Sequence, residues 1–361
     1  MINVAVTGAG KIGTLIACML LDSGDYEVHL LDVVLQGSDL ERLCEVFPNI
    51  KTATLNVKNE DNLVKYFKEH KIAAVLSSLP FYLTLHVAKA AQVVGVNYFD
   101  LTEDVKTTRE VKKIAKNNKF AFVPQCGLAP GFVGIVANDL IGQFDKVDEV
   151  KLRVGALPQR ASNGLHYSLT WSTDGLINEY CNPCIAIEDG KIISHAALEG
   201  LESLVLDGSS YEAFNTSGGL GSLPELYENK IDNLNYKTIR YVGHHDKIFF
   251  LTKELNMQND RENLKNILEK AIPRTYQDMI VIYVSVRGKL KGESFEKSYF
   301  KKIFPTVIRG LNWSAIQVST AAGICAVADL VLEEECYKGF VYQEQFDLRK
   351  ILMNRFGRHY S

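Results

Sequence analysis

The residues best suited to chemistry in this sequence form a glycine-rich turn near the N-terminus. Gly8, Gly10 and Gly13 lie in the run GAGKIG, which follows an apolar segment and opens a helical one. In that context, Gly8 permits a tight turn, Gly10 lets a pyrophosphate approach the backbone, and Gly13 lets helix and strand pack closely. Free amides and the dipole at a helix start favour phosphates. The turn predicts a dinucleotide-binding site that includes Lys11 and Ile12, whereas glycines that only turn the chain are the alternative.

An acidic residue follows this turn at the spacing of a ribose-binding group. Asp32 ends the next apolar segment, 19 residues after Gly13. A carboxylate there accepts hydrogen bonds from the adenosine ribose and repels a 2′-phosphate, so we expect NAD to be preferred over NADP. Val57, at the end of a further segment, is expected close to the adenine.

Two further strand ends carry short or acidic side chains. Ser78, Leu79 and Pro80 follow one apolar segment, and they either flank the nicotinamide ribose or only end the strand. Asp100 ends another segment and is our candidate for the residue that takes up a substrate proton.

Thr102 and Glu103 come directly after Asp100 and are candidate substrate-binding residues. The alternative is that the run from Thr102 to Asp104 caps the next helix.

The second half of the chain offers polar residues without a spacing code. Arg240 is a good carboxylate clamp because its planar fork matches both oxygens, although a surface arginine on a strand is the alternative. His244 and His245 are adjacent and would point to opposite faces of a strand, which makes a poor metal pair. The lone CxxC of Cys181 and Cys184 is interpreted as structural, so no metal is expected.

Alternating strands and helices must position the first group of residues. Apolar runs predict strands at Met1–Val6, Glu27–Leu31, Ile72–Ser77, Asn97–Leu101 and Phe120–Pro124. Helices are expected at Gly13–Leu21, Asp61–Lys68, Leu83–Val94 and Thr107–Lys116. This alternation is typical of an α/β fold with a parallel sheet buried on both faces, whose ligands bind at the carboxyl ends of the strands.

After about residue 150 the pattern changes to longer alternating strands separated by turns. The predicted strands are Lys151–Val154, His166–Trp171, Cys184–Ile187, Ile239–Val242 and Met279–Val286. They indicate a second, α+β domain with a mixed, largely antiparallel sheet. A small-residue-rich helix from Ser314 to Glu335 is expected to return to the first domain. We therefore expect a Rossmann domain at 1–125, a substrate domain at 126–312 and a C-terminal return at 313–361.

Composition narrows the class of protein. The 361 residues carry 40 Lys and Arg against 43 Asp and Glu, and this balance argues against a partner that is a nucleic acid or an anionic membrane. No apolar run long enough to predict a membrane span was identified, and the first residues lack the basic start of a signal peptide. Seven scattered cysteines favour a reducing, cytoplasmic location.

Taken together, these motifs resemble the saccharopine dehydrogenase-like oxidoreductases. The GAGKIG turn, Ser78–Pro80, Phe99–Thr102 and Gly127–Gly131 fall in that family's order and spacing. The second half is more similar to the L-lysine 6-dehydrogenase branch. The runs that carry this second likeness are Val154–Pro158, Leu169–Ser172, Leu176–Tyr180 and Arg240–His244.

The resemblance implies a Rossmann domain, a second domain with a mixed sheet, and a homodimer. It also implies an NAD(P)-dependent enzyme that oxidises a C–N bond of lysine or a lysine-derived amine, with Trp171, Ser172 and His244 lining the substrate pocket. Asn56 stands where an Asp is expected, and the run Thr216–Gly219 stands where the lysine branch tends to have an acidic residue. The second departure bears on which amine is recognised.

Our hypothesis is an NAD-dependent dehydrogenase of an amino-acid side-chain amine, with Arg240 on the α-carboxylate and a cleft bounded by Ser78–Pro80, Asp100–Glu103 and Gly127–Gly131. Saccharopine dehydrogenase is the alternative within the same class, since a larger cleft would accept a second dicarboxylate arm. A binding protein that senses NAD without catalysis is the alternative from another class.

Overall fold

The chain divides into two compact units in the computed structural model, which describes residues 1–334 and 336–361. Unit 1 comprises Met1–Ile135, Thr306–Trp313 and Gln317–Ser361, and unit 2 comprises Val136–Pro305 and Ser314–Ile316. Unit 1 extends past residue 125 because the next segment packs on the C-terminal part of the chain. The ring of Phe132, for example, stacks on Tyr360 with 3.6 Å between centroids.

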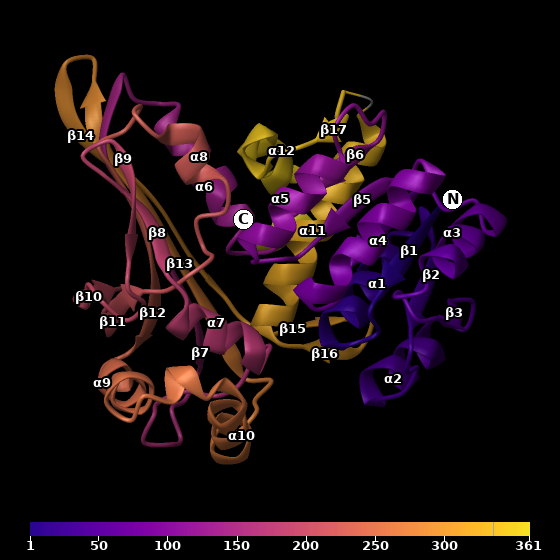
Figure 1. Ribbon diagram of the computed structural model, residues 1–361, viewed down its shortest axis with the longest axis horizontal. Helices are drawn as coiled ribbons and strands as arrows, with labels where there is room; N and C mark the ends of the chain where they lie inside the picture. The colour runs from indigo at the N-terminus through magenta and orange to yellow at the C-terminus, as the bar shows by residue number, and fades with distance from the viewer. Residues whose placement is uncertain (335) are drawn as a thin grey trace. The chain divides into compact units, whose positions relative to one another are not determined.

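Unit 1 is built on a seven-stranded parallel sheet in the order β17-β6-β5-β4-β1-β2-β3 (Figure 1). Its strands are β1 (Ile2–Thr7), β2 (Tyr26–Asp32), β3 (Lys51–Thr54), β4 (Ala74–Ser77), β5 (Asn97–Asp100), β6 (Ala121–Val123) and β17 (Gly339–Phe340). A separate hairpin pairs β15 (Thr306–Ile308) with β16 (Leu311–Trp313). The five predicted strands of this half are confirmed, with small shifts at their ends.

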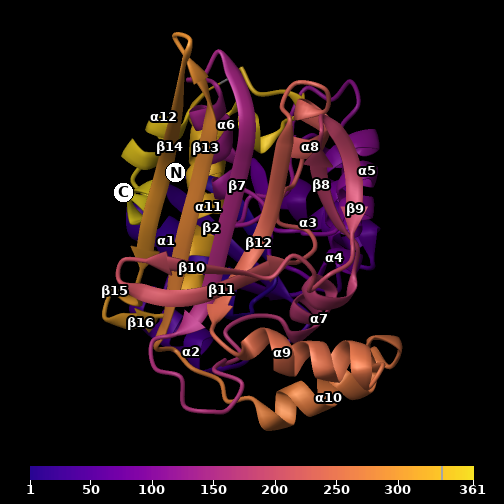
Figure 2. The same ribbon diagram turned by 90° about the vertical axis from the view of Figure 1, so that its left-hand side faces the viewer.

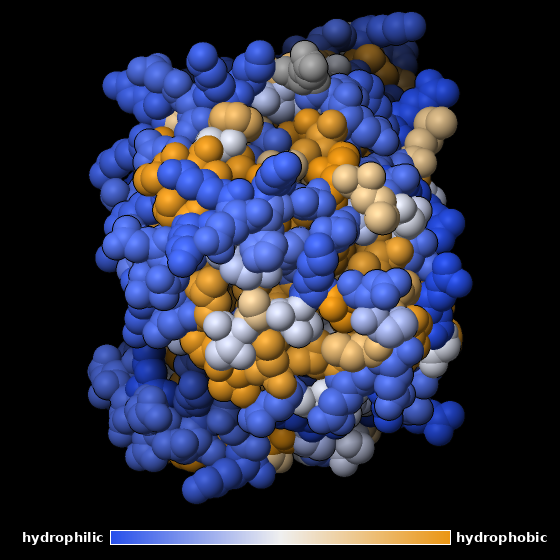
Figure 3. Space-filling model, turned by 90° about the vertical axis from the view of Figure 1, so that its right-hand side faces the viewer, coloured by the Kyte–Doolittle hydropathy of each residue, from blue (hydrophilic) through white to orange (hydrophobic). Residues whose placement is uncertain are grey.

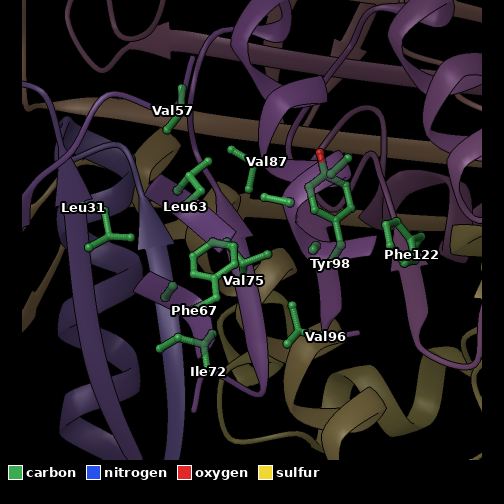
Figure 4. Close-up of a cluster of buried hydrophobic side chains, with 14 of the residues drawn as sticks. Leu31, Val57, Leu63, Phe67, Ile72, Val75, Val87, Val96, Tyr98 and Phe122 are labelled. Atoms are coloured by element: carbon green, nitrogen blue, oxygen red, sulfur yellow. The ribbon is translucent and has the colours of Figure 1, made fainter. Parts of the chain in front are cut away.

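Helices accompany these strands and bury their apolar residues. They are α1 (Lys11–Ser23), α2 (Ser38–Val46), α3 (Glu60–Glu69), α4 (Phe81–Val94), α5 (Val105–Ile114), α11 (Ala315–Glu333) and α12 (Leu348–Met353), with short 3-10 turns at Gln343–Gln345 and Gly357–Tyr360. One core cluster joins Leu63 and Phe67 of α3 to Val87 of α4 and to the strand residues Val75 and Tyr98 (Figure 4). The apolar residues of these two helices thus pack together on the sheet.

The surface of unit 1 is mixed in character. Figure 3 shows apolar side chains in patches between hydrophilic ones on the face that carries α2, α3 and β3. Exposed apolar residues of this unit include Val33, Val34, Tyr82 and Val93.

The long helix α11 fills the core of unit 1 through small side chains. A Cβ atom on Gly323 would lie 2.7 Å from the carbonyl oxygen of Cys126, so only glycine permits this approach. By length and composition, α11 is apolar enough to cross a membrane, but 83% of that stretch is buried, as in the core helix of a globular protein. The helix ends at Glu333, and the expected end at Glu335 lies outside the described residues.

Unit 2 contains an eight-stranded mixed sheet whose long strands run side by side (Figure 2). The strands are β7 (Lys146–Pro158), β8 (Cys184–Glu188), β9 (Lys191–His195), β10 (Glu202–Leu206), β11 (Ser209–Asn215), β12 (Asn233–Tyr241), β13 (Asp278–Leu290) and β14 (Glu293–Ile303). Among the described strands of this sheet, β12 and β7 pair in parallel, and the other neighbours are antiparallel. The prediction of a mixed, largely antiparallel sheet is confirmed.

Short helices complete unit 2. They are α7 (Thr173–Cys181), α8 (Leu223–Tyr227), α9 (His244–Phe249), a π-helical turn (Phe250–Glu254), a 3-10 turn (Met257–Asn259) and α10 (Arg261–Ala271), and α6 (Phe132–Ile141) continues into this unit from unit 1. The predicted strand at His166–Trp171 is wrong. This segment is a loop that makes a single β-bridge, between Leu169 and Arg274, because His166 adopts a left-handed backbone with φ of 54°.

Candidate dinucleotide and substrate sites

Three neighbouring strands of unit 1 end in register at one edge of the sheet. Thr7 of β1 pairs with Ser77 of β4, and Ser77 pairs with Asp100 of β5. The residues that follow these strands are the glycine turn, Ser78 and the Thr102–Asp104 run. Ligands of parallel sheets bind at the carboxyl ends of the strands. The predicted cofactor residues therefore lie together at the edge of the sheet where a ligand is expected.

The geometry of the glycine turn fits a dinucleotide pyrophosphate. Gly8 has φ of 98°, a left-handed conformation that favours glycine. A Cβ atom on Gly13 would lie 1.7 Å from the carbonyl oxygen of Gly8, so the turn packs directly on α1. A Cβ atom on Gly10, by contrast, would have no atom within 4 Å. The space beside Gly10, at the start of α1, is therefore open to a ligand.

Asp32 lies against this turn. Its carboxylate accepts a hydrogen bond from the backbone amide of Ala9 at 2.6 Å and one from Val34 at 3.2 Å. Val33 and Val34, which follow Asp32, are half exposed. These exposed apolar residues next to Asp32 were not singled out from the sequence.

The residues after β4 contact the glycine turn. The Ser78 hydroxyl donates to the carbonyl oxygens of Thr7 at 3.1 Å and Gly8 at 3.0 Å. Leu79 lies next to Gly8, and Pro80 precedes the first residue of α4. Ser78 thus holds the turn in place.

Three other predicted cofactor residues take different positions. The Lys11 carbonyl accepts a hydrogen bond from the Gln317 amide at 3.0 Å, and Ile12 is half-buried in the first turn of α1. Val57 packs into the core beside Leu63 (Figure 4), so its side chain does not present an open surface for an adenine.

Asp100 is fully buried and heavily hydrogen-bonded. Its carboxylate accepts from the Tyr98 hydroxyl at 2.7 Å and from the backbone amides of Thr102 at 2.9 Å and Gln125 at 3.1 Å. Burial raises the pKa of Asp100 from its ordinary value of 3.8 to about 6, although these hydrogen bonds oppose the shift. In this structure, Asp100 ties the end of β5 to the segment after β6.

The run after Asp100 combines a helix cap with a half-buried acid. Asp104 caps α5 by accepting from the Thr107 amide at 2.7 Å, and the Thr102 hydroxyl accepts from the Asp104 amide at 3.2 Å. Glu103 does not provide the cap. Burial raises the pKa of Glu103, which remains partly accessible. The helix-cap alternative therefore applies to Asp104, while Glu103 keeps access to a ligand.

Arg240 lies on β12 in unit 2 and is buried, not on the protein surface. Its Nε donates to the Tyr180 hydroxyl at 2.9 Å and its Nη1 to the Ile239 carbonyl at 2.9 Å. The nearest carboxylate is that of Glu179, 3.7 Å from Nη2.

His244, at the start of α9, contacts the same tyrosine. Its Nε2 lies 3.0 Å from the Tyr180 hydroxyl, and its Nδ1 lies 2.9 Å from the Leu165 carbonyl oxygen. Burial, aided by the charge of Arg240, lowers the pKa of His244 well below its ordinary value, so the ring is neutral near pH 7.

Trp171 and Ser172 precede α7. The Ser172 hydroxyl accepts from the Gly175 amide at 3.2 Å and so caps the helix. The Trp171 ring lies 2.3 Å from where a Cβ atom on Gly175 would be, so glycine is needed for this packing. Sequence reasoning missed Tyr167, whose ring centroid lies 4.9 Å from Cζ of Arg240, and no motif spacing pointed to it.

The Gly127–Gly131 loop and the cysteines were also considered as candidate sites from the sequence. The loop from Gly127 to Gly131 is largely buried, so it does not offer the exposed backbone amides that its composition indicated. All seven cysteines, including Cys181 and Cys184, are free thiols. Within residues 1–334 and 336–361, no three His, Cys, Asp or Glu side chains are grouped to hold a metal ion.

Comparisons with known proteins match both halves of the chain. The saccharopine dehydrogenase NADP binding domain model matches residues 4–123, and the saccharopine dehydrogenase C-terminal domain model matches residues 127–359. Alpha-aminoadipic semialdehyde synthase, mitochondrial, from Bos taurus is 24% identical over 86% of this chain and 34% of the relative. The protein of that name from Rattus norvegicus is 23% identical over 83% of this chain and 33% of its own length. The chain thus spans about a third of these curated relatives.

Two solved structures share the fold. Apo saccharopine dehydrogenase (L-Glu forming) from Saccharomyces cerevisiae has a TM-score of 0.77 at 16% identity, covering 98% of this chain and 97% of that one. Homospermidine synthase from Legionella pneumophila, in complex with NAD, has a TM-score of 0.65 at 12% identity, covering 99% and 89%.

The parallel sheet with its glycine turn, joined to a unit with a mixed sheet, defines a dinucleotide-binding oxidoreductase fold. Since the two family models together cover nearly the whole sequence, the chain belongs to the saccharopine dehydrogenase family. The resemblance inferred from sequence motifs is confirmed.

Proposed function

We propose that the protein is an NAD-linked dehydrogenase that oxidises the C–N bond of lysine or a lysine-derived amine. The observation that carries the proposal is the glycine turn with its open space at Gly10 and the Asp32 carboxylate 2.6 Å from the Ala9 amide. These groups sit at the sheet edge where Asp100 ends β5. A reacting amine and a dinucleotide would thus meet acidic residues at that edge.

The turn residues would hold the cofactor, which supplies hydride acceptance when bound. Backbone amides at the start of α1 would face the pyrophosphate, and Asp32 would accept from the ribose hydroxyls. Because a 2′-phosphate would face the Asp32 carboxylate, we propose NAD as the preferred cofactor, although the matched family model is named for NADP.

A substrate amine must lose a proton before it can transfer a hydride, so the site needs a base. Asp100 is the base proposed from the sequence, and its pKa of about 6 suits the role. Its complete burial and three hydrogen bonds favour a holding role instead. Glu103 is the second candidate, because it is more accessible and burial also raises its pKa.

Lysine-derived substrates are supported by the names of the relatives, alpha-aminoadipic semialdehyde synthase and saccharopine dehydrogenase. Arg240 would bind a substrate carboxylate. Its burial supports this role over that of a surface arginine, because a desolvated guanidinium binds a carboxylate more strongly than an exposed one.

The test is NAD reduction by the purified protein over L-lysine, saccharopine, L-ornithine and cadaverine, followed by absorbance of the reduced cofactor. Arg240→Ala should weaken substrate binding by about 2–4 kcal/mol and leave NAD binding little changed. Arg287→Ala, which removes an exposed arginine of the same unit, is the control. Asp100→Asn and Glu103→Gln identify the base, since loss of the base lowers turnover more than affinity.

The outcomes separate the alternatives. Turnover of saccharopine but not lysine would assign the protein to saccharopine oxidation. Tight NAD binding without reduction by any of these amines would refute the dehydrogenase proposal and favour a protein that binds NAD without catalysis.

A further inference from the structure

The side chain of Gln317, near the start of α11, holds the first turn of α1. Its Nε2 donates to the carbonyl oxygen of Lys11 at 3.0 Å, and Gln317 is only 1% exposed. Lys11 lies inside the glycine turn and is the first residue of α1. The two residues are 306 positions apart in the sequence, so this contact exists only in the folded unit.

The peptide group that Gln317 holds carries an amide that the proposed cofactor needs. The Lys11 carbonyl and the Ile12 N–H belong to the same planar group. The Thr14 amide bonds the Gly10 carbonyl at 2.9 Å, so the Ile12 amide lies before the first hydrogen-bonded turn and has no acceptor within the helix. Amides in this position bind phosphate groups. A hydrogen bond to the Lys11 carbonyl fixes the plane of the peptide group and polarises its N–H.

A buried carboxylate of unit 2 fixes the start of α11, directly before Gln317. Asp278, the first residue of β13, is fully buried and accepts from the backbone amides of Ala315 at 2.6 Å and Ile316 at 2.9 Å. Because both of its oxygens accept amide hydrogens, the carboxylate caps α11, and the helix dipole strengthens these bonds. Gln317 is the next residue of the helix, so Asp278 sets the position of its backbone.

Helix α11 therefore belongs to both units. Ser314–Ile316 is part of unit 2, and the chain from Gln317 onward is part of unit 1. Asp278 is itself anchored within unit 2, because it pairs with Pro158 of β7 and its carbonyl oxygen accepts from the Gln159 side chain at 3.0 Å. The first turn of α11 thus joins the central strands of the mixed sheet to the glycine turn.

We infer that Gln317 is a positioning residue for the dinucleotide, and that Asp278 acts through it, so that cofactor affinity depends on a carboxylate of unit 2. Neither side chain has to touch the cofactor. Gln317 sets the direction of the Ile12 amide, and Asp278 sets the place of Gln317. The inference rests on the dinucleotide site of the proposed function and adds to it a dependence on the other unit.

The experiment is isothermal titration calorimetry of the full chain with NADH and with ADP-ribose, beside urea unfolding of each variant. Gln317→Met keeps the size of the side chain and removes its amide. It should weaken both ligands by roughly three- to tenfold, as for one lost hydrogen bond, because ADP-ribose carries the same pyrophosphate. The control is Gln343→Met, which should leave both affinities almost unchanged. Gln343 is a buried glutamine of unit 1 whose Nε2 donates to the Pro124 carbonyl at 2.8 Å.

Asp278→Asn keeps the shape of the side chain but turns one acceptor into a donor, so one amide of α11 loses its partner. NADH affinity should fall several-fold, whereas Glu212→Gln should leave it almost unchanged. Glu212 is the matched control, because this buried carboxylate of unit 2 accepts from the amides of Gly243 and His245 at the start of α9. Ala315→Pro takes the place of Asp278→Asn if that variant does not fold. It removes the same hydrogen bond from the other side, since proline lacks the amide hydrogen and fits the first position of a helix.

The double variant tests whether Asp278 acts through Gln317. Asp278→Asn combined with Gln317→Met should bind NADH no more than about twofold more weakly than Gln317→Met alone. If the two losses multiply instead, the residues act independently and the inference is overturned. It is also overturned if Gln317→Met binds both ligands as tightly as the control does, or if only NADH is weakened.

Binding and turnover separate this inference from the proposed function. If NADH binds with these dependences but no amine reduces NAD, the positioning roles stand and the dehydrogenase proposal fails. If amines are oxidised while NADH affinity is insensitive to both residues, the proposed function stands and this inference is overturned. Failure of the unmodified chain to bind either NADH or ADP-ribose overturns both.

Discussion

We propose that Asp32 sets which dinucleotide the turn accepts, because its carboxylate lies 2.6 Å from the Ala9 amide, where an adenosine ribose is expected. Asp32→Ser removes the negative charge that would repel a 2′-phosphate. We expect the ratio of NADPH to NADH affinity to rise by at least about tenfold, or 1.4 kcal/mol, in fluorescence titrations of both cofactors. Asp61→Ser, on the exposed start of α3, is the control. Tighter binding of NADPH than of NADH by the unmodified protein would contradict this assignment.

Asp100 makes the stability of the fold depend on pH in a definite direction. Its pKa is about 6 in the folded chain against 3.8 ordinarily, so the folded state holds this proton when the unfolded state has lost it. The contribution of Asp100 to the free energy of unfolding is therefore fully present below pH 3.8. It is lost as pH rises from 3.8 through about 6, and the total loss is about 3 kcal/mol.

Asp100→Asn keeps the shape of the side chain and cannot ionise. Urea unfolding of this variant should lack the decline between about pH 4 and pH 6, and at pH 7 the variant should be at least as stable as the unmodified chain. An unchanged pH profile would show that Asp100 does not ionise with a raised pKa in the fold.

At the level of single residues, the sequence was enough to predict the groups whose roles depend only on neighbouring residues in the chain. The glycine turn and Asp32 were predictable because strand, turn and helix follow each other within one short segment. The contact between Arg240 and the Tyr180 hydroxyl was not predictable, because the two residues lie 60 positions apart in the sequence. The burial of Asp100 could not be predicted from the sequence either, because one of the amides that binds its carboxylate belongs to Gln125, which follows the next strand.

The two glycines that flank the start of α1 have separable roles in the turn. A methyl group at Gly13 would collide with the Gly8 carbonyl, whereas one at Gly10 would meet nothing within 4 Å. Gly13→Ala should therefore destabilise unit 1 by about 1–3 kcal/mol or more, as overpacking does. Gly10→Ala should leave the unfolding midpoint nearly unchanged and weaken NADH binding by roughly tenfold or more, because the pyrophosphate needs that space.

Unfolding curves and NADH titrations on the same two variants measure both effects, and each variant is the control for the other. Equal losses of stability and affinity in both variants would show that Gly10 has no separate role in binding the cofactor.

Among the elements, those with continuous burial were the easiest to predict. Strands β1, β2, β4, β5 and β6 are short apolar runs inside a parallel sheet, and each was found from its composition. Strands β9, β10 and β14 were missed, because most of their residues remain partly or fully exposed and give only a weak alternating pattern. Strand β11 was also missed, although its last five residues are buried. The loop at His166–Trp171 was mistaken for a strand because its buried aromatic and aliphatic side chains resemble one.

At the scale of the whole molecule, unit 1 is not a continuous piece of the sequence. Strand β17 pairs with β6, and α11 supplies buried side chains to the same unit from the C-terminal part of the chain. The aliphatic residues of α11 larger than alanine that are at least nine-tenths buried are Val318, Ile324, Val327, Leu330 and Val331. At about 1.5–3 kcal/mol for each large side chain, their burial contributes roughly 10 kcal/mol, comparable to the whole stability of a typical domain.

The segment Met1–Ile135 alone should therefore not fold into a stable dinucleotide-binding domain, although it contains the complete glycine turn. We expect it to unfold without a cooperative transition in urea and to bind NADH at least about a hundredfold more weakly than the full chain, because several kcal/mol of folding energy are lost. Joining Met1–Ile135 to residues 306–361 by a flexible Gly/Ser linker should restore cooperative unfolding, since it returns α11 and β17 to the unit. Cooperative unfolding and full NADH affinity in the short segment would show that the turn and the first six strands suffice, and that α11 only covers a core that is already stable.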